Sequence, residues 1–209
     1  MKQLSICIIL LVLTACGEAP QKKRDMLFNG DNLSGWEMAV MPGADMQQAT
    51  ELFRAEQGNI KIAGEPFGYL YTVEQHSVYK LHFEWRWVGE PTNSGVFIHV
   101  QNPGDVWPRA YEFQLMAGHA GDMVMLGGAK LEDFPCEGEF PIKPREGDYE
   151  NATGEWNTGE IVVNGPFLEF YVNGHLQNQA TAKFETGHIA LQSEGGPLEL
   201  RNIYLEAIE

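Results

Sequence analysis

Strict alternation of apolar and polar residues from Leu81 to Trp87 is the feature that most restricts the fold of this chain. Successive side chains of a β-strand point to opposite faces, so four apolar residues share one face and His82, Glu84 and Arg86 share the other. The apolar face predicts a ladder that packs into a core. The polar face carries an imidazole, a carboxylate and a guanidinium about 7 Å apart, twice the rise per residue. Such a row is typical either of a functional surface, such as a binding or catalytic site, or of an outer face held by salt bridges.

Short strand-like segments recur along the chain, whereas helical periodicity is almost absent. Only residues 45–52 predict a short helix. The predicted strands are residues 53–56, 59–62, 69–72, 79–87, 95–100, 111–115, 160–163, 168–172, 188–192 and 198–206. Turn pairs such as Asn164-Gly165 and Asn173-Gly174 separate several of them. About ten short strands without βα alternation predict an all-β, antiparallel two-sheet sandwich, interrupted by an irregular segment over residues 116–158.

Polar side chains also occupy outward positions on four other predicted strands. These side chains are His99, Glu112, Gln114, Gln192 and Arg201. If the strands lie side by side in one sheet, the outward faces pool into a groove of carboxylates, imidazoles and guanidiniums that suits sugar chemistry. Trp107 and Trp156, in or near loops, could then act as stacking platforms. The alternative is a set of surface ion pairs, such as Glu84 with Arg86, each of which contributes little to stability.

The first residues resemble the signal of a bacterial lipoprotein. Lys2 precedes an apolar stretch from Ile6 to Leu13 that is too short to span a bilayer, and the tetrapeptide ending at Cys16 resembles a lipobox. We expect a signal peptide over residues 1–15, lipidation at Cys16, a tether over residues 16–25 and one sandwich domain over residues 26–209. This arrangement predicts a lipid anchor in the bacterial cell envelope. Gly17 favours the outer membrane, without indicating on which side the domain lies.

Cysteine content and charge narrow the remaining possibilities. Cys7 leaves with the predicted signal, so Cys136 has no partner and the domain depends on its core rather than on disulfides. The formal net charge of −15 excludes binding to nucleic acid or anionic lipid through bulk electrostatics. Neutral partners such as carbohydrates remain compatible with this charge.

Seven short motifs follow one another along the chain. They are Leu27–Trp36, Glu84–Arg86, Asn93–Phe97, Tyr111–Gln114, Gly154–Asn157, Val172–Gly174 and Arg201–Ile203. Each motif is weak alone, but in this order they resemble the 3-keto-disaccharide hydrolase domain family, which is common among bacterial lipoproteins. The resemblance covers residues 27–206. It implies a concanavalin A-like jelly roll, in agreement with the strand pattern, and action on glycosides whose C3 hydroxyl has been oxidised to a ketone.

A C3 ketone makes a distinct chemistry available, because it acidifies the proton on C2. A base can remove that proton, the C1 substituent can leave, and water can add to the resulting enone. The reaction needs a base near C2, a positive or hydrogen-bonding group at the enolate oxygen, and an acid at the leaving oxygen. From residue chemistry and strand face we expect Glu84 or Glu112 as the base, Arg86 as the clamp and His99 as the acid. The expected sugar-binding residues are His82, Asn93, Gln114, Lys143, Trp156, Gln192 and Arg201.

Two other functions remain open at this stage. One is a non-catalytic, lectin-like carbohydrate-binding module with the same fold. The other is a two-carboxylate hydrolase of unoxidised glucans, in which the carboxyl groups of Glu84 and Glu112 would lie about 5–5.5 Å or 6.5–9.5 Å apart. No cofactor is predicted, since the histidine spacing does not resemble a zinc protease site. Asp25, Asn29 and Asp31 could offer oxygen ligands to a structural Ca²⁺, but capping of a tight turn explains these residues equally well.

Overall fold

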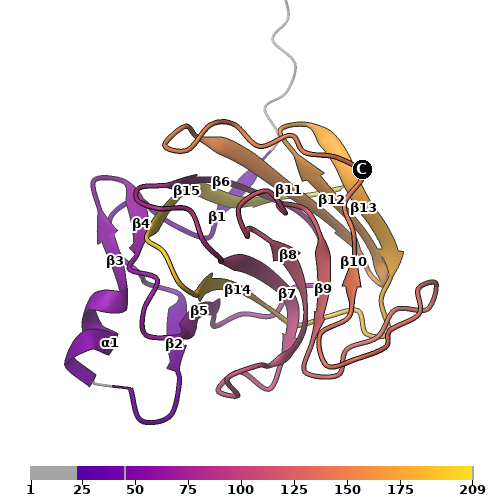
Figure 1. Ribbon diagram of the computed structural model, residues 1–209, viewed down its shortest axis with the longest axis horizontal. Coiled ribbons are helices and arrows are strands. Elements are labelled where there is room, and N and C mark those ends of the chain that lie inside the picture. Colours follow the sequence, from indigo (N-terminus) through magenta and orange to yellow (C-terminus); the bar gives the residue numbers. More distant parts are fainter. Residues whose placement is uncertain (1–22, 45, 209) are drawn as a thin grey trace, which may run out of the picture.

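Figure 1 shows a computed structural model of the chain, which describes residues 23–44 and 46–208. The protein is an antiparallel two-sheet jelly-roll sandwich, as the strand pattern predicts. Its described part holds one short helix, α1 (Met46–Leu52), at the edge of the sandwich next to β2. No described helix is long and apolar enough to cross a membrane.

The first sheet, which we call sheet A, contains eight strands. They are β1 (Arg24–Met26), β3 (Phe53–Glu56), β4 (Asn59–Ile62), β6 (Val78–Trp87), β11 (Asn157–Asn164), β12 (Phe167–Val172), β13 (His175–Thr181) and β15 (Leu198–Glu206). Their order is β13-β12-β11-β6-β15-β4-β3, and β1 pairs with β15. The strand β6, whose alternation is so regular, therefore lies in the middle of this sheet.

The second sheet, sheet B, contains seven strands. They are β2 (Trp36–Val40), β5 (Gly68–Thr72), β7 (Gly95–Gln101), β8 (Arg109–Gln114), β9 (Met123–Leu126), β10 (Ile142–Lys143) and β14 (His188–Ser193). Their order is β10-β9-β8-β7-β14-β5-β2. The chain passes from sheet A to sheet B between β6 and β7, so neighbours in sequence become opposite layers of the sandwich.

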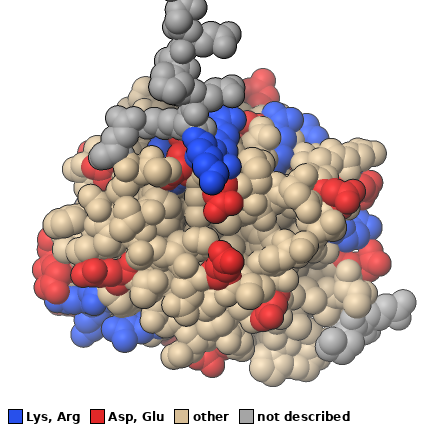
Figure 2. Space-filling model, turned by 180° about the vertical axis from the view of Figure 1, so that it is seen from behind, with Lys and Arg blue, Asp and Glu red and all other residues tan. Residues whose placement is uncertain are grey.

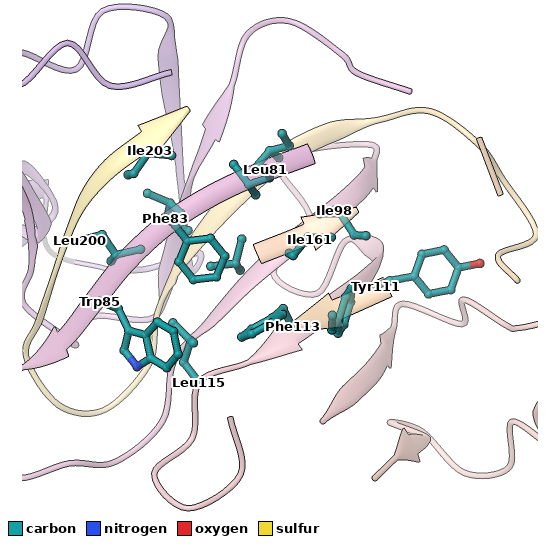
Figure 3. Packing of buried hydrophobic residues seen from close by; sticks show 14 of the residues in the cluster. Leu81, Phe83, Trp85, Ile98, Tyr111, Phe113, Leu115, Ile161, Leu200 and Ile203 are labelled. Carbon is teal, nitrogen blue, oxygen red and sulfur yellow. The ribbon is translucent and has the colours of Figure 1, made fainter. Parts of the chain in front are cut away.

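The core between the sheets is built from the apolar positions of the alternating strands, as Figure 3 shows around Phe83 and Trp85. Both side chains are fully buried, and Trp87 is 4% exposed, so the prediction that this face packs into the core is confirmed. Phe83 of sheet A meets Phe113 of sheet B edge to face, with 5.4 Å between ring centroids. Gly159, opposite Phe83 on β11, leaves room for its ring, because a Cβ there would fall 2.2 Å from it.

The predicted helix and strands are present, with several strands longer by one or more residues. Sequence reasoning missed β1, β2, β9, β10 and β13. The strands β9 and β10 lie within the segment 116–158 that was expected to be irregular, and β13 carries too many polar residues to alternate clearly. The strand β1 begins at Arg24, inside the tether predicted over residues 16–25, because it pairs with β15. The predicted signal peptide and Cys16 lie outside the described residues.

Figure 2 shows the protein from behind relative to Figure 1, and the charged side chains on this face form small, separate groups. Basic atoms gather near the top and at the lower left of that view, and acidic ones are scattered between them. The net charge of −15 therefore does not produce one continuous acidic surface on this side.

Candidate functional site

The predicted site residues divide between the two outer faces of the sandwich. The strands β6 and β15 carry Glu84, Arg86 and Arg201 in sheet A, whereas β8 and β14 carry Glu112 and Gln192 in sheet B. The expectation of a single pooled groove is therefore wrong. Alternation shows which face of a strand is polar, but these strands belong to different sheets, and the shared core separates their polar faces.

On sheet B, the side chain of Glu112 lies over Gly95, on the face turned away from the core. Glu112 pairs with Phe97, and a Cβ added to Gly95 would fall only 2.1 Å from Oε1 of Glu112. The pairing of Leu191 with Val96 brings the next residue of β14, Gln192, beside Gly95 from the other side. The glycine of the Asn93–Phe97 motif thus provides the space in which side chains of β8 and β14 approach each other.

The carboxyl group of Glu194 lies close enough to act electrostatically on that of Glu112. Glu112 is 3% exposed, and its Oε1 is buried without a hydrogen-bond partner. Burial raises the pKa of Glu112 well above its ordinary value, and the neighbouring charge of Glu194 raises it further. Burial also raises the pKa of Glu194, against the opposing effect of hydrogen bonds from Asn93 and Gln192. Burial therefore favours the protonated form of both carboxyl groups.

Amide side chains surround these two carboxyl groups. Nε2 of Gln192 donates to Oε2 of Glu194 over 2.6 Å. Oε1 of Gln192 and Oδ1 of Asn93 are buried without partners. Gln114 is held by its own Oε1, which accepts the backbone N–H groups of Leu115 and Met116. We call Asn93, Glu112, Gln114, Gln192 and Glu194 the Glu112 cluster. Among the described residues, no Lys or Arg forms an ion pair with its carboxyl groups, so the cluster suits ligands that donate hydrogen bonds.

Aromatic residues border the Glu112 cluster on the same face of sheet B. Tyr69 of β5 pairs with Gln192, and its hydroxyl donates to the Asp105 carbonyl and accepts the Gly104 N–H, each over 2.8 Å. This clamp fixes the loop that carries Trp107. Trp107 packs against the apolar residues of this face and meets Phe140 edge to face, with 5.4 Å between ring centroids. Trp107 therefore lies on the same face of sheet B as the Glu112 cluster, and its role as a stacking platform stays a prediction.

The outer face of sheet A is an ion-pair network. Glu84 accepts hydrogen bonds from Arg201 Nε and Asn202 Nδ2, each over 2.7 Å. Burial acts to raise the pKa of Glu84, but the hydrogen bonds from Asn202 and Arg201 together outweigh it and lower the pKa. Arg86 binds one oxygen of Glu199 through two nitrogens, at 3.0 and 2.7 Å. The pairs join neighbouring strands because the register sets Glu84 opposite Arg201 and Arg86 opposite Glu199.

Aromatic rings complete this network on sheet A. The guanidinium groups of Arg86 and Arg201 lie 4.6 and 3.9 Å from the ring centroid of Trp156. His82 stacks on Tyr204, with 4.6 Å between ring centroids. Trp156 thus contacts both arginines, and His82 packs on Tyr204, on the side of the sandwich away from the Glu112 cluster. For this half of the predicted set, the salt-bridged outer face is the better interpretation.

His99 and Lys143 lie apart from both faces. The backbone of His99 has a φ of 53°, and the register between β7 and β8 shifts there, which turns the ring toward Tyr111 and Phe184 on the core side. Burial lowers the pKa of His99 to about 4, against a smaller effect of the Phe184 backbone. Lys143 donates to the carbonyl of Gln179 and ties β10 to β13. The structure therefore brings neither residue into the Glu112 cluster.

Sequence reasoning missed Glu194, which lies beyond the predicted end of its strand in a glycine-rich turn. Its position two residues after Gln192 was the available signal, because alternation then sends both side chains to one face. No group of three or more His, Cys, Asp or Glu residues suited to a metal occurs among the described residues. Oδ1 of Asn29 accepts the N–H groups of Asp31 and Asn32 at 2.8 and 2.9 Å, which is the turn-capping arrangement.

Comparisons with known proteins agree with this fold. The sequence profile of the 3-keto-alpha-glucoside-1,2-lyase-like domain family matches residues 24–206. No curated protein sequence matches the chain. A structure described as a glycosyl hydrolase of Parabacteroides distasonis ATCC 8503 has a TM-score of 0.64 and 20% identity, over 89% of this chain and 94% of that one. A β-glucanase of Bacillus licheniformis has a TM-score of 0.58 and 12% identity, over 92% and 100%. The carbohydrate-binding module CBM66 of Bacillus subtilis has a TM-score of 0.60 and 9% identity, over 83% and 96%.

Proposed function

Because the chain belongs to the 3-keto-alpha-glucoside-1,2-lyase-like domain family, we propose that it cleaves glycosides whose sugar carries a ketone at C3. Membership of the family supports a carbohydrate-active protein. The cleavage of a 3-keto glycoside, and the residues that carry it out, are what we propose. One observation carries it: on the outer face of sheet B, the buried Glu112 lies close enough to Glu194 to feel its charge, and three amide side chains accompany the pair. Paired carboxyl groups of different protonation are what an elimination requires.

In the proposed reaction, Glu194 acts as the base and Glu112 as the acid. The carboxylate of Glu194 takes the proton from C2, and the electrons of that C–H bond form an enolate with the C3 ketone. The ketone then reforms while the bond from C1 to the leaving oxygen breaks, and the protonated carboxyl of Glu112 supplies that oxygen with a proton. Water adds across the resulting C1–C2 double bond and restores a 3-keto sugar.

The proposed base is thus Glu194, and not Glu84 or Glu112, the two candidates expected from the sequence. Hydrogen bonds from Arg201 and Asn202 stabilise the Glu84 carboxylate and lower its pKa, which makes it a weak base. The developing charge on the ketone oxygen needs donors in place of the Arg86 clamp first expected. The amides of the Glu112 cluster, with Gln114 fixed through its own oxygen, are the side chains that we assign to this role.

The test compares a glucoside with its 3-keto derivative as substrates of the purified protein. We expect release of the leaving group from the 3-keto compound only, with a transient ultraviolet absorbance from the enone. The variants Glu112→Gln and Glu194→Gln should each slow release by about 10²- to 10⁴-fold. Glu37→Gln, which removes a carboxylate bonded to Tyr71 on the same sheet, is the control and should leave the rate unchanged. Release from the unoxidised glucoside alone would contradict the proposal, and binding without release would indicate a lectin-like module.

We also propose that the protein is anchored through a lipid on Cys16 in the bacterial cell envelope, in its outer membrane. The lipobox-like sequence that ends at Cys16 supports this location. Expression of a Cys16→Ser variant should move the protein from the membrane fraction to the soluble fraction. Equal membrane association of the variant and the wild type would contradict the anchor.

A further inference from the structure

A pocket at one end of the sandwich is lined by none of the residues of the Glu112 cluster. It lies between the turn at Ala117 and Gly118, the end of β6 at Trp87, and residues 148–157, which precede and begin β11. Its volume is about 270 Å³. Small-molecule sites begin at about 300 Å³, so this pocket lies just below that range and suits only a small ligand, such as a single sugar unit.

The walls of this pocket are held by hydrogen bonds. Oδ1 of the buried Asn157 accepts the backbone N–H of Asn151 over 2.7 Å and Nδ2 of Asn173 over 2.9 Å. Oε1 of Glu150 accepts the Ala120 N–H over 3.0 Å, which joins the acidic segment to the turn on the other side. The pocket is thus largely formed before a ligand arrives, which lowers the entropic cost of binding.

The lining chemistry is acidic. Asp148, Glu150 and Glu155 all line the pocket, and no Lys or Arg is among its lining residues. Trp87, which also lines it, is 4% exposed, and its indole N–H is buried without an acceptor. Burial raises the pKa of Glu150, so the negative charge of the lining rests mainly on Asp148 and Glu155. Hydroxyl groups can donate hydrogen bonds to these carboxylates, whereas a ligand carboxylate would be repelled by them.

The pocket is close to the Glu112 cluster along two chain segments. Pro91 lines the pocket two residues before Asn93, and Ala117 lines it three residues after Gln114. An extended chain covers at most about 3.3–3.6 Å per residue, so Pro91 lies within about 7 Å of Asn93, and Ala117 within about 11 Å of Gln114, along the backbone. The Ala117 N–H donates to the Thr92 carbonyl over 3.0 Å and holds the segments together.

We propose that this pocket binds the sugar unit that leaves when the glycoside is cleaved, and that it selects neutral or positively charged leaving sugars over those that carry a carboxylate. The identity of the occupant as the leaving sugar rests on the proposed function. The preference for its charge rests on the lining residues alone. The pocket is therefore a specificity site, and its residues lie outside the reacting cluster.

The test uses two substrates with the same 3-keto-glucosyl group, one with glucose and one with glucuronate as the leaving sugar. For the wild type, we expect kcat/KM to be about tenfold lower with glucuronate, equivalent to about 1.4 kcal/mol. In the double variant Asp148→Asn/Glu155→Gln, this ratio should fall to about threefold or less, mainly through KM. Glu146→Gln, an exposed carboxylate of the same loop that does not line the pocket, should keep the wild-type ratio.

Equal kcat/KM for both substrates in the wild type, or an unchanged ratio in the double variant, would overturn the inference. A second arm needs no cleavage: calorimetry with the unoxidised glucosyl-glucose and glucosyl-glucuronate disaccharides should give the same preference in Kd. Absence of binding by both disaccharides, or equal binding of both, would also overturn it. If neither 3-keto substrate is cleaved, the proposed function fails while the calorimetry still decides whether the pocket selects by charge.

Discussion

Replacing Gly95 with alanine tests the geometry of the Glu112 cluster directly. The added Cβ would fall 2.1, 2.8 and 2.9 Å from Oε1, Cδ and Cγ of Glu112. All three atoms belong to a side chain that is 3% exposed, so the carboxyl group cannot swing freely into solvent. Overpacking of this kind costs about 1–3 kcal/mol. In a chain of 150–250 residues, each 1 kcal/mol lowers Tm by about 2–4 °C, so we expect a loss of about 2–12 °C.

The assay is a double-mutant cycle measured by urea unfolding. Gly95→Ala is introduced into the wild type and into a Glu112→Ala background, where the obstructing atoms are absent. If the clash is with Glu112, the substitution should cost at least about 1 kcal/mol less in that background. The single Gly95→Ala variant should also lose activity on a 3-keto glycoside, because its acid is displaced. Equal costs in both backgrounds would refute the reasoning and would show that Glu112 does not occupy the space over Gly95.

Three further predictions follow from the two faces and the core. Hydrogen bonds from His82 and Lys80 lower the pKa of Glu160 from 4.5 to about 2. Glu160 therefore adds stability above pH 4.5 that is lost as the pH falls toward 2. Across this range, the free energy of unfolding should depend less on pH in Glu160→Gln than in the wild type, and parallel curves for the two proteins would contradict this. Glu84→Gln should keep kcat/KM for a 3-keto glycoside within about threefold of the wild type, since Glu84 serves the sheet A network; a loss of about 10²-fold or more would return it to catalysis. Phe83→Ala should cost about 3–5 kcal/mol in urea unfolding, because it empties the centre of the core, and a cost below about 1 kcal/mol would contradict the packing.

Alternation in the sequence predicts the faces of the strands well but leaves their assignment to sheets open. The segment from Leu81 to Trp87 predicts a buried apolar ladder, and the structure confirms it, since the burial of each residue depends on local periodicity. The polar row of this strand gave no information on whether it would lie beside Glu112. That depends on strand pairing over long sequence distances, which periodicity does not encode.

Two local irregularities limit prediction of the site more sharply. At His99, a left-handed backbone conformation shifts the register of β7 and reverses the face expected from simple alternation. At Glu194, a turn residue retains the direction of the strand that precedes it and joins Gln192. The motif that contains Gly95 carried only the family resemblance, and the structure shows that the space over this glycine is filled by a carboxyl group from the neighbouring strand.

The exchange of hydrogen at C2 of the substrate tests the central claim most directly. In D₂O, the Glu112→Gln variant should incorporate deuterium at C2 of a 3-keto glycoside while releasing its leaving group at least about 10²-fold more slowly than the wild type, because the base remains and the acid is gone. The Glu194→Gln variant should show neither exchange nor release. Wild-type rates of release in both variants, or cleavage without any exchange at C2, would contradict elimination by this pair of carboxyl groups.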